Sequence, residues 1–391
     1  MGKKVQAQFI KQPKFFKSFH CIGGSCPVSC CHRWRIDYQN DEVEKLKNAE
    51  CSDSLKKIIN ESFEPYLQGD KMMIKLTDKK KCPFHNEEGL CAIQKELGEE
   101  YLSLVCKNYP RNAMFFGDYV LRSCTISCPH VLSMICCDEN SMDLENTLVT
   151  KKSKIIFMDS DIANINNPAF KFRSILFDFF YEILFDKSRS IETSIVLGAM
   201  AAQKLDEYIK QRKYDRIPDI IKALKPQLNN PAQIAKLENV NPNLSLKANF
   251  SAGLLKLMNN ASIYTNIFEN GIPSEEKYNR GMEEFKKHFN GIPGFMRNIA
   301  LNLYITNKMP FRDKELSLFE NYCYFVSEIA VIKFLIPAVA IHFEPAYEQV
   351  QMAISIIDRS FTHNDANVKP ILDYMKAFKC TTPAYLLGII K

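Results

Sequence analysis

The stretch Cys21–Cys31 reads CIGGSCPVSCC and places four thiols within eleven residues. Two glycines and one proline interrupt it, so we expect a tightly folded loop in place of a helix or a regular strand. Several thiolates on one loop suit a soft metal ion or an iron–sulfur cluster, since both prefer sulfur to oxygen ligands. The stretch therefore predicts a thiolate-bound metal centre. A disulfide, or a loop that is merely rich in cysteine, is the alternative.

The fourteen cysteines are unevenly distributed along the chain. Twelve of them lie in the first 137 residues, and only Cys323 and Cys380 follow. The chain therefore divides into a cysteine-rich metal-binding domain, which we place at residues 1–140, and a second domain at residues 141–391. Polar sequence at about 140–165 supplies the connection between them.

Hydrophobic periodicity predicts a mainly α fold. We expect short strands, loops and helices at about 41–66 and 92–106 in the first domain, and an all-helical carboxyl-terminal domain after it. The segment FRSILFDFFYEILF (172–185) is apolar nearly all round, which predicts a buried helix. Pro129, directly after Cys128, is suited to the first turn of a further helix.

The composition is that of an ordinary soluble globular protein, with 46% hydrophobic residues, 25% charged residues and a net charge of +6. This charge is mild, and no arginine-rich patch with interleaved aromatic residues is present, so we expect no nucleic-acid partner. The longest apolar candidate for a membrane span, Ile329–Ile341, is too short and contains Lys333, and no signal-peptide core is visible. We therefore expect a cytoplasmic protein without a transmembrane segment, whose reduced thiols are available to a metal.

Eight thiols lie on predicted loops or at predicted helix ends, namely Cys21, Cys26, Cys30, Cys31, Cys82, Cys91, Cys106 and Cys128. Eight would serve two four-thiolate sites, or one cluster with additional structural thiols, and the spacing leaves both arrangements open. Adjacent Cys30 and Cys31 point in different directions, so one could ligate a metal while the other serves a second site. Cys124, Cys136 and Cys137 are expected to be core residues.

Four segments around these cysteines, FHCIGGSCPVSCCHRWRI, CPFHNEEGLCAIQKELG, CKNYPR and CPHVL, resemble the flagellin lysine-N-methylase family. More distantly, they resemble small proteins with a CxxCxxCC-type zinc- or iron-chelating cluster. Far downstream, IDRSFTHN, which starts at residue 357, is similar to that methylase family's Ser-Arg…Glu-His-Asn block. Arg359, His363 and Asn364 match this block, whereas Asp358 stands where the family usually has Ser and Thr362 where it often has Glu.

The resemblance implies a protein-lysine N-methyltransferase that uses S-adenosylmethionine, acts on flagellin and depends on a Cys-ligated 4Fe–4S cluster. It makes Arg359, His363 and Asn364 candidate catalytic residues. Tyr109 and Arg111 of the CKNYPR segment join them, because an aromatic face could hold the cationic sulfonium of the donor and an arginine could bind its carboxylate.

The residues themselves do not locate the binding site for S-adenosylmethionine. The sequence contains neither a GxG loop of the nucleotide-binding type nor a CxxxCxxC run. A non-catalytic module is therefore the alternative function, with zinc held by the thiolates and the helical domain serving as a protein-interaction surface.

Overall fold

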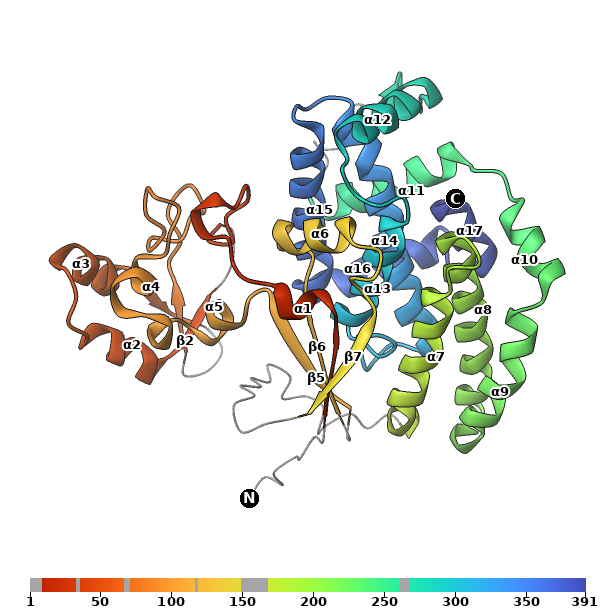
Figure 1. Ribbon diagram of the computed structural model, residues 1–391, viewed down its shortest axis with the longest axis horizontal. Coiled ribbons are helices and arrows are strands. Elements are labelled where there is room, and N and C mark those ends of the chain that lie inside the picture. The colour runs from red at the N-terminus through yellow and green to blue at the C-terminus, as the bar shows by residue number, and fades with distance from the viewer. Residues whose placement is uncertain (1–8, 33–35, 67–70, 117–118, 149–167, 261–266) are drawn as a thin grey trace.

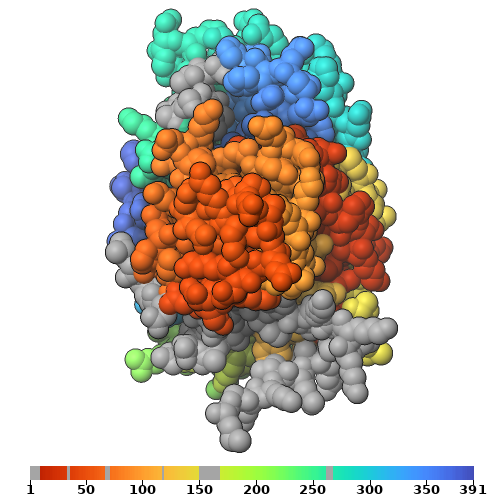
Figure 2. All heavy atoms as spheres, turned by 90° about the vertical axis from the view of Figure 1, so that its left-hand side faces the viewer, coloured from red at the N-terminus to blue at the C-terminus, as the bar shows by residue number. Residues whose placement is uncertain are grey.

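The computed structural model describes residues 9–32, 36–66, 71–116, 119–148, 168–260 and 267–391 (Figure 1). Two lobes of unequal size lie side by side along its long axis. Residues 36–106 form the small lobe, and the elements outside this range and outside the loop Cys21–Cys31 form the large lobe. Viewed from its own end, the small lobe projects towards the viewer (Figure 2). The loop Cys21–Cys31 leads from the large lobe to the small one.

The small lobe combines short helices with an antiparallel three-stranded sheet in the order β2-β4-β3. Its elements are β2 (Asp37–Gln39), α2 (Asn40–Lys47), α3 (Asp53–Glu61), β3 (Phe63–Pro65), β4 (Lys71–Ile74), α4 (Ala92–Leu97), η2 (Glu99–Tyr101) and α5 (Leu104–Asn108). Buried apolar side chains such as Leu46, Ile59 and Phe84 form a core separate from the main core of the large lobe.

The two helices predicted for this region are both interrupted, so the predictions were wrong in extent. Ser52 caps α3 by accepting a hydrogen bond from the Leu55 N–H, and the expected helix at 41–66 is split into α2 and α3 before it ends in β3. Gly98, with a positive φ of 92°, ends α4 and breaks the expected helix at 92–106. Apolar spacing continues across both breaks, which is why periodicity did not detect them.

A four-stranded sheet in the order β5-β6-β1-β7 opens the large lobe. Its elements are β1 (Phe9–Pro13), β5 (Arg111–Phe115), β6 (Tyr119–Cys124) and β7 (Leu144–Leu148), accompanied by α1 (Phe15–Ser18) and α6 (Pro129–Cys137). The strand β1 is internal, because Ile10 pairs with Val120 of β6 in parallel and with Thr147 of β7 in antiparallel orientation. The sheet therefore ties the segment before the cysteine loop to the segment that follows the small lobe.

Helices form most of the large lobe, and about 60% of the structure is helical, which confirms the mainly α class. The helices are α7 (Arg173–Phe185), α8 (Ile191–Lys210), α9 (Ile217–Leu228), α10 (Pro231–Glu238), α11 (Leu244–Leu257), α12 (Glu275–His288), α13 (Phe295–Thr306), α14 (Leu318–Ala340), α15 (Ala346–Thr362), α16 (Val368–Ala377) and α17 (Pro383–Ile390). The buried helix predicted at 172–185 is confirmed as α7. The carboxyl-terminal part is not strictly all-helical, since it contains β7 and a short hairpin of β8 (Phe268–Glu269) and β9 (Ile272–Pro273).

The helix α14 is the centre of the large lobe and packs against α8, α11, α12, α15 and α17. All of its residues except Glu320 and Lys333 are buried. By length and composition α14 could cross a membrane, and 94% of its most apolar window is buried inside the protein. The sequence predicts a long hydrophobic helix or a kinked pair over this stretch, broken at Pro337, and the structure has one helix there that continues through Pro337. A buried core helix has the same composition, and the expected absence of a transmembrane segment stays a prediction.

The proposed division at residues 140 and 141 falls between α6 and β7 and stays a prediction. Cys124 and Cys136 are buried, as expected for core residues. The prediction for Cys137 was wrong, because this thiol takes an exposed position at the last residue of α6.

Candidate functional site

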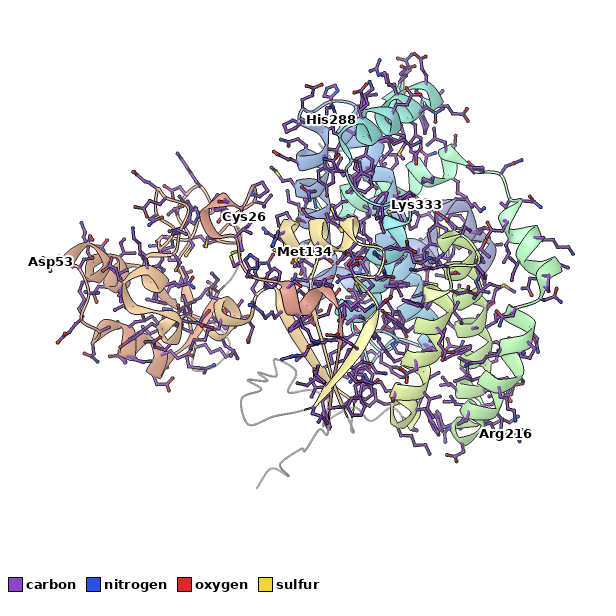
Figure 3. All side chains as sticks on the ribbon, viewed as in Figure 1. Cys26, Asp53, Met134, Arg216, His288 and Lys333 are labelled. Carbon is purple, nitrogen blue, oxygen red and sulfur yellow. The ribbon has the colours of Figure 1, made fainter. Side chains whose placement is uncertain are left out.

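The cysteine loop lies between the lobes and has little regular structure, as its composition predicts. Its one described helical element is the turn η1 (Gly23–Ser25). A side chain at Gly24 would place its Cβ 2.7 Å from the backbone oxygen of Glu88, so glycine permits a close approach to the turn that precedes Cys91. Cys26 lies on the edge of the small lobe that faces the large lobe (Figure 3).

The carboxyl end of the loop is bound to the second cysteine segment. The backbone N–H of Cys82 donates to the carbonyl oxygen of Cys31 at 2.7 Å. One residue further out, His32 and Lys81 form an antiparallel bridge. Two cysteine segments that are distant in sequence are thereby held side by side.

Four thiols, Cys31, Cys82, Cys91 and Cys106, pack against the core of the small lobe, and we call them the inner thiols. Burial raises the pKa of Cys82 to about 12, and the neighbouring thiols Cys91 and Cys106 contribute in the same direction. Burial likewise raises the pKa of Cys106 to about 11. A bound metal would reverse this preference for the protonated form, because thiols ionise on coordination.

The other four thiols, Cys21, Cys26, Cys30 and Cys128, form a second group that we call the outer thiols. Burial raises the pKa of Cys26, and the nearby Cys30 and Cys21 add to that rise. Burial also raises the pKa of Cys128 to about 11, with further contributions from Cys26 and Cys30. The thiol of Cys30 also forms a hydrogen bond with the thiol of Cys31, so the inner and outer thiols adjoin at this pair.

The structure thus gathers all eight predicted thiols around one loop without a finished metal site. Among the described residues, no three side chains of Cys, His, Asp or Glu form a group that could hold a metal ion as they stand. The donor set itself fits a thiolate-bound metal or cluster, because all fourteen cysteines are free thiols and eight gather on adjoining segments. The presence of a metal and its identity stay predictions.

Three of the predicted catalytic residues meet at the turn 125–128, between β6 and α6. The buried hydroxyl of Ser127 donates to the Tyr109 hydroxyl at 3.2 Å and lies 3.1 Å from Nε2 of His363. The guanidinium of Arg359 donates to the backbone oxygen of Ser127 at 3.4 Å. We call Ser127, Tyr109, Arg359 and His363 the Ser127 cluster.

The electrostatics of the Ser127 cluster favour a neutral imidazole. Desolvation by the surrounding protein lowers the pKa of His363, although the residue keeps an exposed edge. Because Ser127 donates its single hydroxyl hydrogen to Tyr109, Nε2 of His363 supplies the hydrogen in their contact and Nδ1 is the basic nitrogen. The positive charge of Arg359 counteracts the rise in the pKa of Cys26 that burial causes. Arg359 thus links the Ser127 cluster electrostatically to an outer thiol.

The other two predicted catalytic residues are exposed neighbours of the Ser127 cluster, since Arg111 pairs with Cys124 and Asn364 follows His363. Arg111 is the exposed first residue of β5, and its guanidinium lies over the ring of Phe19 at 4.9 Å from the ring centre. Asn364 is exposed after the end of α15, where its carbonyl oxygen accepts the Asn367 N–H at 3.0 Å. Within the described residues neither has a hydrogen bond to Ser127, and their roles stay predictions.

Sequence reasoning missed the residues that organise the Ser127 cluster. The hydroxyl-rich run TIS directly before Cys128 was the available signal for Ser127 and Thr125. Asp358 was noticed only as a departure from the family block, yet it is fully buried. Glu328 is a fully buried acid inside the apolar sequence of α14, and an acid in such a run is itself a signal.

Two surface cavities lie elsewhere on the large lobe. One of about 670 Å³ is lined by α8, α9, α10 and α17, and one of about 480 Å³ by α11, α16 and α17. Their lining residues include no cysteine and no member of the Ser127 cluster. The thiols and the Ser127 cluster therefore define the candidate site.

Fold and site together define a mainly helical protein with a thiol-rich centre between its lobes and an Arg–His–Ser–Tyr cluster beside it. The family of the FliB lysine N-methylase C-terminal domain matches residues 177–389, and the chain belongs to this family. The match includes Arg359 and His363 but lies wholly outside the cysteine segments. Family membership is thus independent of the thiols, and the resemblance noted in the sequence is confirmed.

Similar proteins carry related names. Lysine-N-methylases of Salmonella typhimurium and Salmonella choleraesuis are each 26% identical over 247 residues, which cover 61% of this chain and 58% of theirs. The flagellar biosynthetic protein FliU of Salmonella muenchen is 30% identical over 138 residues, 34% of this chain and 81% of its own. The chain therefore spans about 58% of the length of the lysine-N-methylases it matches. No solved structure matches the chain.

Proposed function

We propose that the protein is a cytoplasmic protein-lysine N-methyltransferase that uses S-adenosylmethionine, acts on flagellin and depends on a Cys-ligated iron–sulfur cluster. Membership of the FliB family supports lysine methylation, and the name of the FliU relative supports a flagellar substrate. The observation that carries the proposal is the turn 125–128, which joins the family-matched Arg359 and His363 to the outer thiol Cys128.

Lysine methylation first requires the ε-ammonium group to lose a proton, because its free pKa is about 10.4. The neutral imidazole of His363 can accept that proton at Nδ1. An ammonium N–H bond breaks, an imidazole N–H bond forms, and the freed lone pair attacks the methyl carbon. The electron pair of the methyl–sulfur bond then stays on sulfur, so the donor leaves as a neutral thioether.

The methyl donor is a sulfonium cation that also carries a carboxylate. The ring of Tyr109 lies beside His363, with ring centres 6.5 Å apart, and its face could attract the sulfonium. Arg359 supplies the guanidinium group of the Ser127 cluster and could pair with the donor carboxylate. The same three side chains would therefore orient the donor and receive the proton.

The two thiol groups suggest a division of labour. The outer thiols would hold the iron–sulfur cluster, because Cys26 and Cys30 among them lie near Arg359. A bound iron–sulfur cluster would supply electron transfer or a Lewis-acidic iron. The inner thiols would hold a metal that stabilises the small lobe. Their burial in a core is also the observation that favours the alternative function, a zinc-binding interaction module without catalysis.

The test is the metal content and the activity of protein purified without oxygen. We expect about four irons and four acid-labile sulfides per chain, an absorption band bleached by dithionite, and methyl transfer from S-adenosylmethionine to flagellin. Cys128→Ala should lose iron and activity together. Zinc without iron, and no methyl transfer, would instead support the interaction module.

Matched variants separate the two thiol groups. Cys91→Ala should lose the metal of the small lobe and lower its stability, and Cys26→Ala should behave like Cys128→Ala. Cys137→Ala is the control, because this thiol is exposed at the end of α6 and belongs to neither group. Full metal content in both Cys26→Ala and Cys91→Ala would remove these residues from the set of ligands.

A further inference from the structure

Two carboxyl groups meet in the interior of the large lobe, beneath the Ser127 cluster. Glu328 of α14 and Asp358 of α15 are each 0% exposed, and the two helices pack together. The side chains hydrogen bond to one another. Since carboxylates only accept hydrogen bonds, that contact requires one of the two groups to carry a proton.

The donors around the pair indicate which group is charged. Asp358 accepts hydrogen bonds from the hydroxyls of Thr125, at 2.6 Å, and Thr362, at 2.8 Å. Glu328 accepts one bond from the Asn307 amide at 2.7 Å, and its Oε1 has no donor among the described residues. Burial and the adjacent Asp358 raise the pKa of Glu328 well above its usual range. Glu328 is therefore the neutral acid and Asp358 the carboxylate.

Charged and titratable groups face the pair from each neighbouring element. From the segment after α13 comes Arg312, which donates to the Phe361 carbonyl and to Asp365 and lies over the Tyr324 ring. From α15 and its end come Arg359, His363 and Asp365, and α14 contributes Tyr324. The turn 125–128 contributes Cys128 as its one titratable group. The single negative charge on the pair and the charge of Asp365 are thus matched by the guanidinium groups of Arg312 and Arg359.

We infer that Glu328 and Asp358 share one proton and act as positioning residues for the Ser127 cluster. The hydroxyl of Thr125 donates to Asp358 and accepts the backbone N–H of Ser127 at 3.3 Å, so the carboxylate fixes the turn that carries Ser127. Its negative charge also favours a proton on His363. The catalytic consequence rests on the proposed function, whereas the shared proton does not.

Infrared spectroscopy of the full-length protein tests the shared proton without any assay of activity. The wild-type spectrum should contain the carbonyl band of a protonated, buried carboxylic acid. This band should be absent from the spectrum of Glu328→Gln. Glutamine retains the shape of the acid and a donor towards Asp358, so this variant is expected to fold. An acid band that persists unchanged in Glu328→Gln would overturn the inference.

The pH dependence of methyl transfer tests the positioning role. Asp358→Asn removes the charge beside His363, so the acidic limb of the pH–rate profile should move to lower pH and the rate at neutral pH should fall at least ten times further than in Glu328→Gln. Asp206→Asn is the control. Asp206 is also a buried carboxylate, but it accepts hydrogen bonds from the backbone N–H groups of Leu318 and Phe319, the first two residues of α14. It should alter stability and leave the profile unshifted.

The outcomes separate the two proposals. If the wild-type protein transfers no methyl group, but its acid band is absent from the spectrum of Glu328→Gln, the proposed function fails and the shared proton stands. If methyl transfer is present and Asp358→Asn shifts the profile no more than Asp206→Asn does, the positioning role fails and the proposed function stands.

Discussion

Ser127 contributes one hydroxyl to which several groups of the candidate site are bound. It is 0% exposed and contacts Tyr109 and His363 through Oγ. In Ser127→Ala these groups lose a buried partner, so we expect the free energy of unfolding to fall by about 1–3 kcal/mol. Methyl transfer should fall more steeply than substrate binding, as judged by kcat and KM measured separately.

Ser251→Ala is the matched control for Ser127→Ala. Ser251 is also 0% exposed, but its hydroxyl bonds to the carbonyl oxygen of Ala330 between α11 and α14, away from the thiols. We expect a loss of stability with kcat unchanged. Equal losses of kcat in the two variants would contradict a specific role for Ser127.

Lys247 gives a prediction about pH. It is 4% exposed on α11, and burial lowers its pKa from 10.5 to about 8. Below pH 8 both folded and unfolded states bind the proton, whereas between pH 8 and 10.5 mainly the unfolded state does, so this group adds stability as pH rises. Lys247→Met should therefore be more stable than wild type at neutral pH, by a margin of a few kcal/mol that shrinks towards about pH 10.

Urea unfolding across that range measures the margin. Lys256→Met, an exposed position on the same helix, is the control and should show no pH-dependent difference from wild type. A margin for Lys247→Met that stays constant with pH would show that the buried amine is charged throughout.

At the scale of elements, the cysteine loop depends on its close approach to the turn at Glu88. Gly24→Ala would place a methyl group 2.7 Å from a backbone oxygen, which cannot move aside as a flexible side chain would. We expect this variant to lose bound metal and some thermal stability. Gly294→Ala, where an added Cβ meets nothing within 4 Å, should keep both. Metal analysis and thermal unfolding of the two proteins make the comparison.

The elements also show how far the sequence could predict the structure. The buried helix α7 was predictable because an apolar surface on all sides has no other stable environment. The breaks at Ser52 and Gly98 were not, since a cap and a left-handed glycine interrupt a helix without interrupting its apolar spacing. Local sequence suggested that the thiols would gather, but the contact of Ser127 with His363 depends on the packing of elements 236 residues apart.

At the scale of the whole molecule, the two lobes have separate cores, and the inner thiols belong to the smaller one. Removing metal with a chelator should therefore speed up amide hydrogen exchange in residues 36–106, while the helices α7–α17 stay protected. Hydrogen-exchange mass spectrometry of the full chain, with and without chelator, checks this. Loss of protection throughout the chain would show one cooperative unit, and unchanged protection in residues 36–106 would show that no metal supports the small lobe.

The internal position of β1 has a consequence for synthesis of the chain. Phe9–Pro13 is synthesised before both of its neighbours, β6 and β7, so neither of its edges can pair until those strands have been made. The Ser127 cluster waits still longer, because His363 follows α15. Throughout that interval the thiols of the loop are open to oxidants and to stray metal ions. Loading of the outer thiols would thus follow synthesis of Cys128, and their contact with Arg359 would follow synthesis of α15.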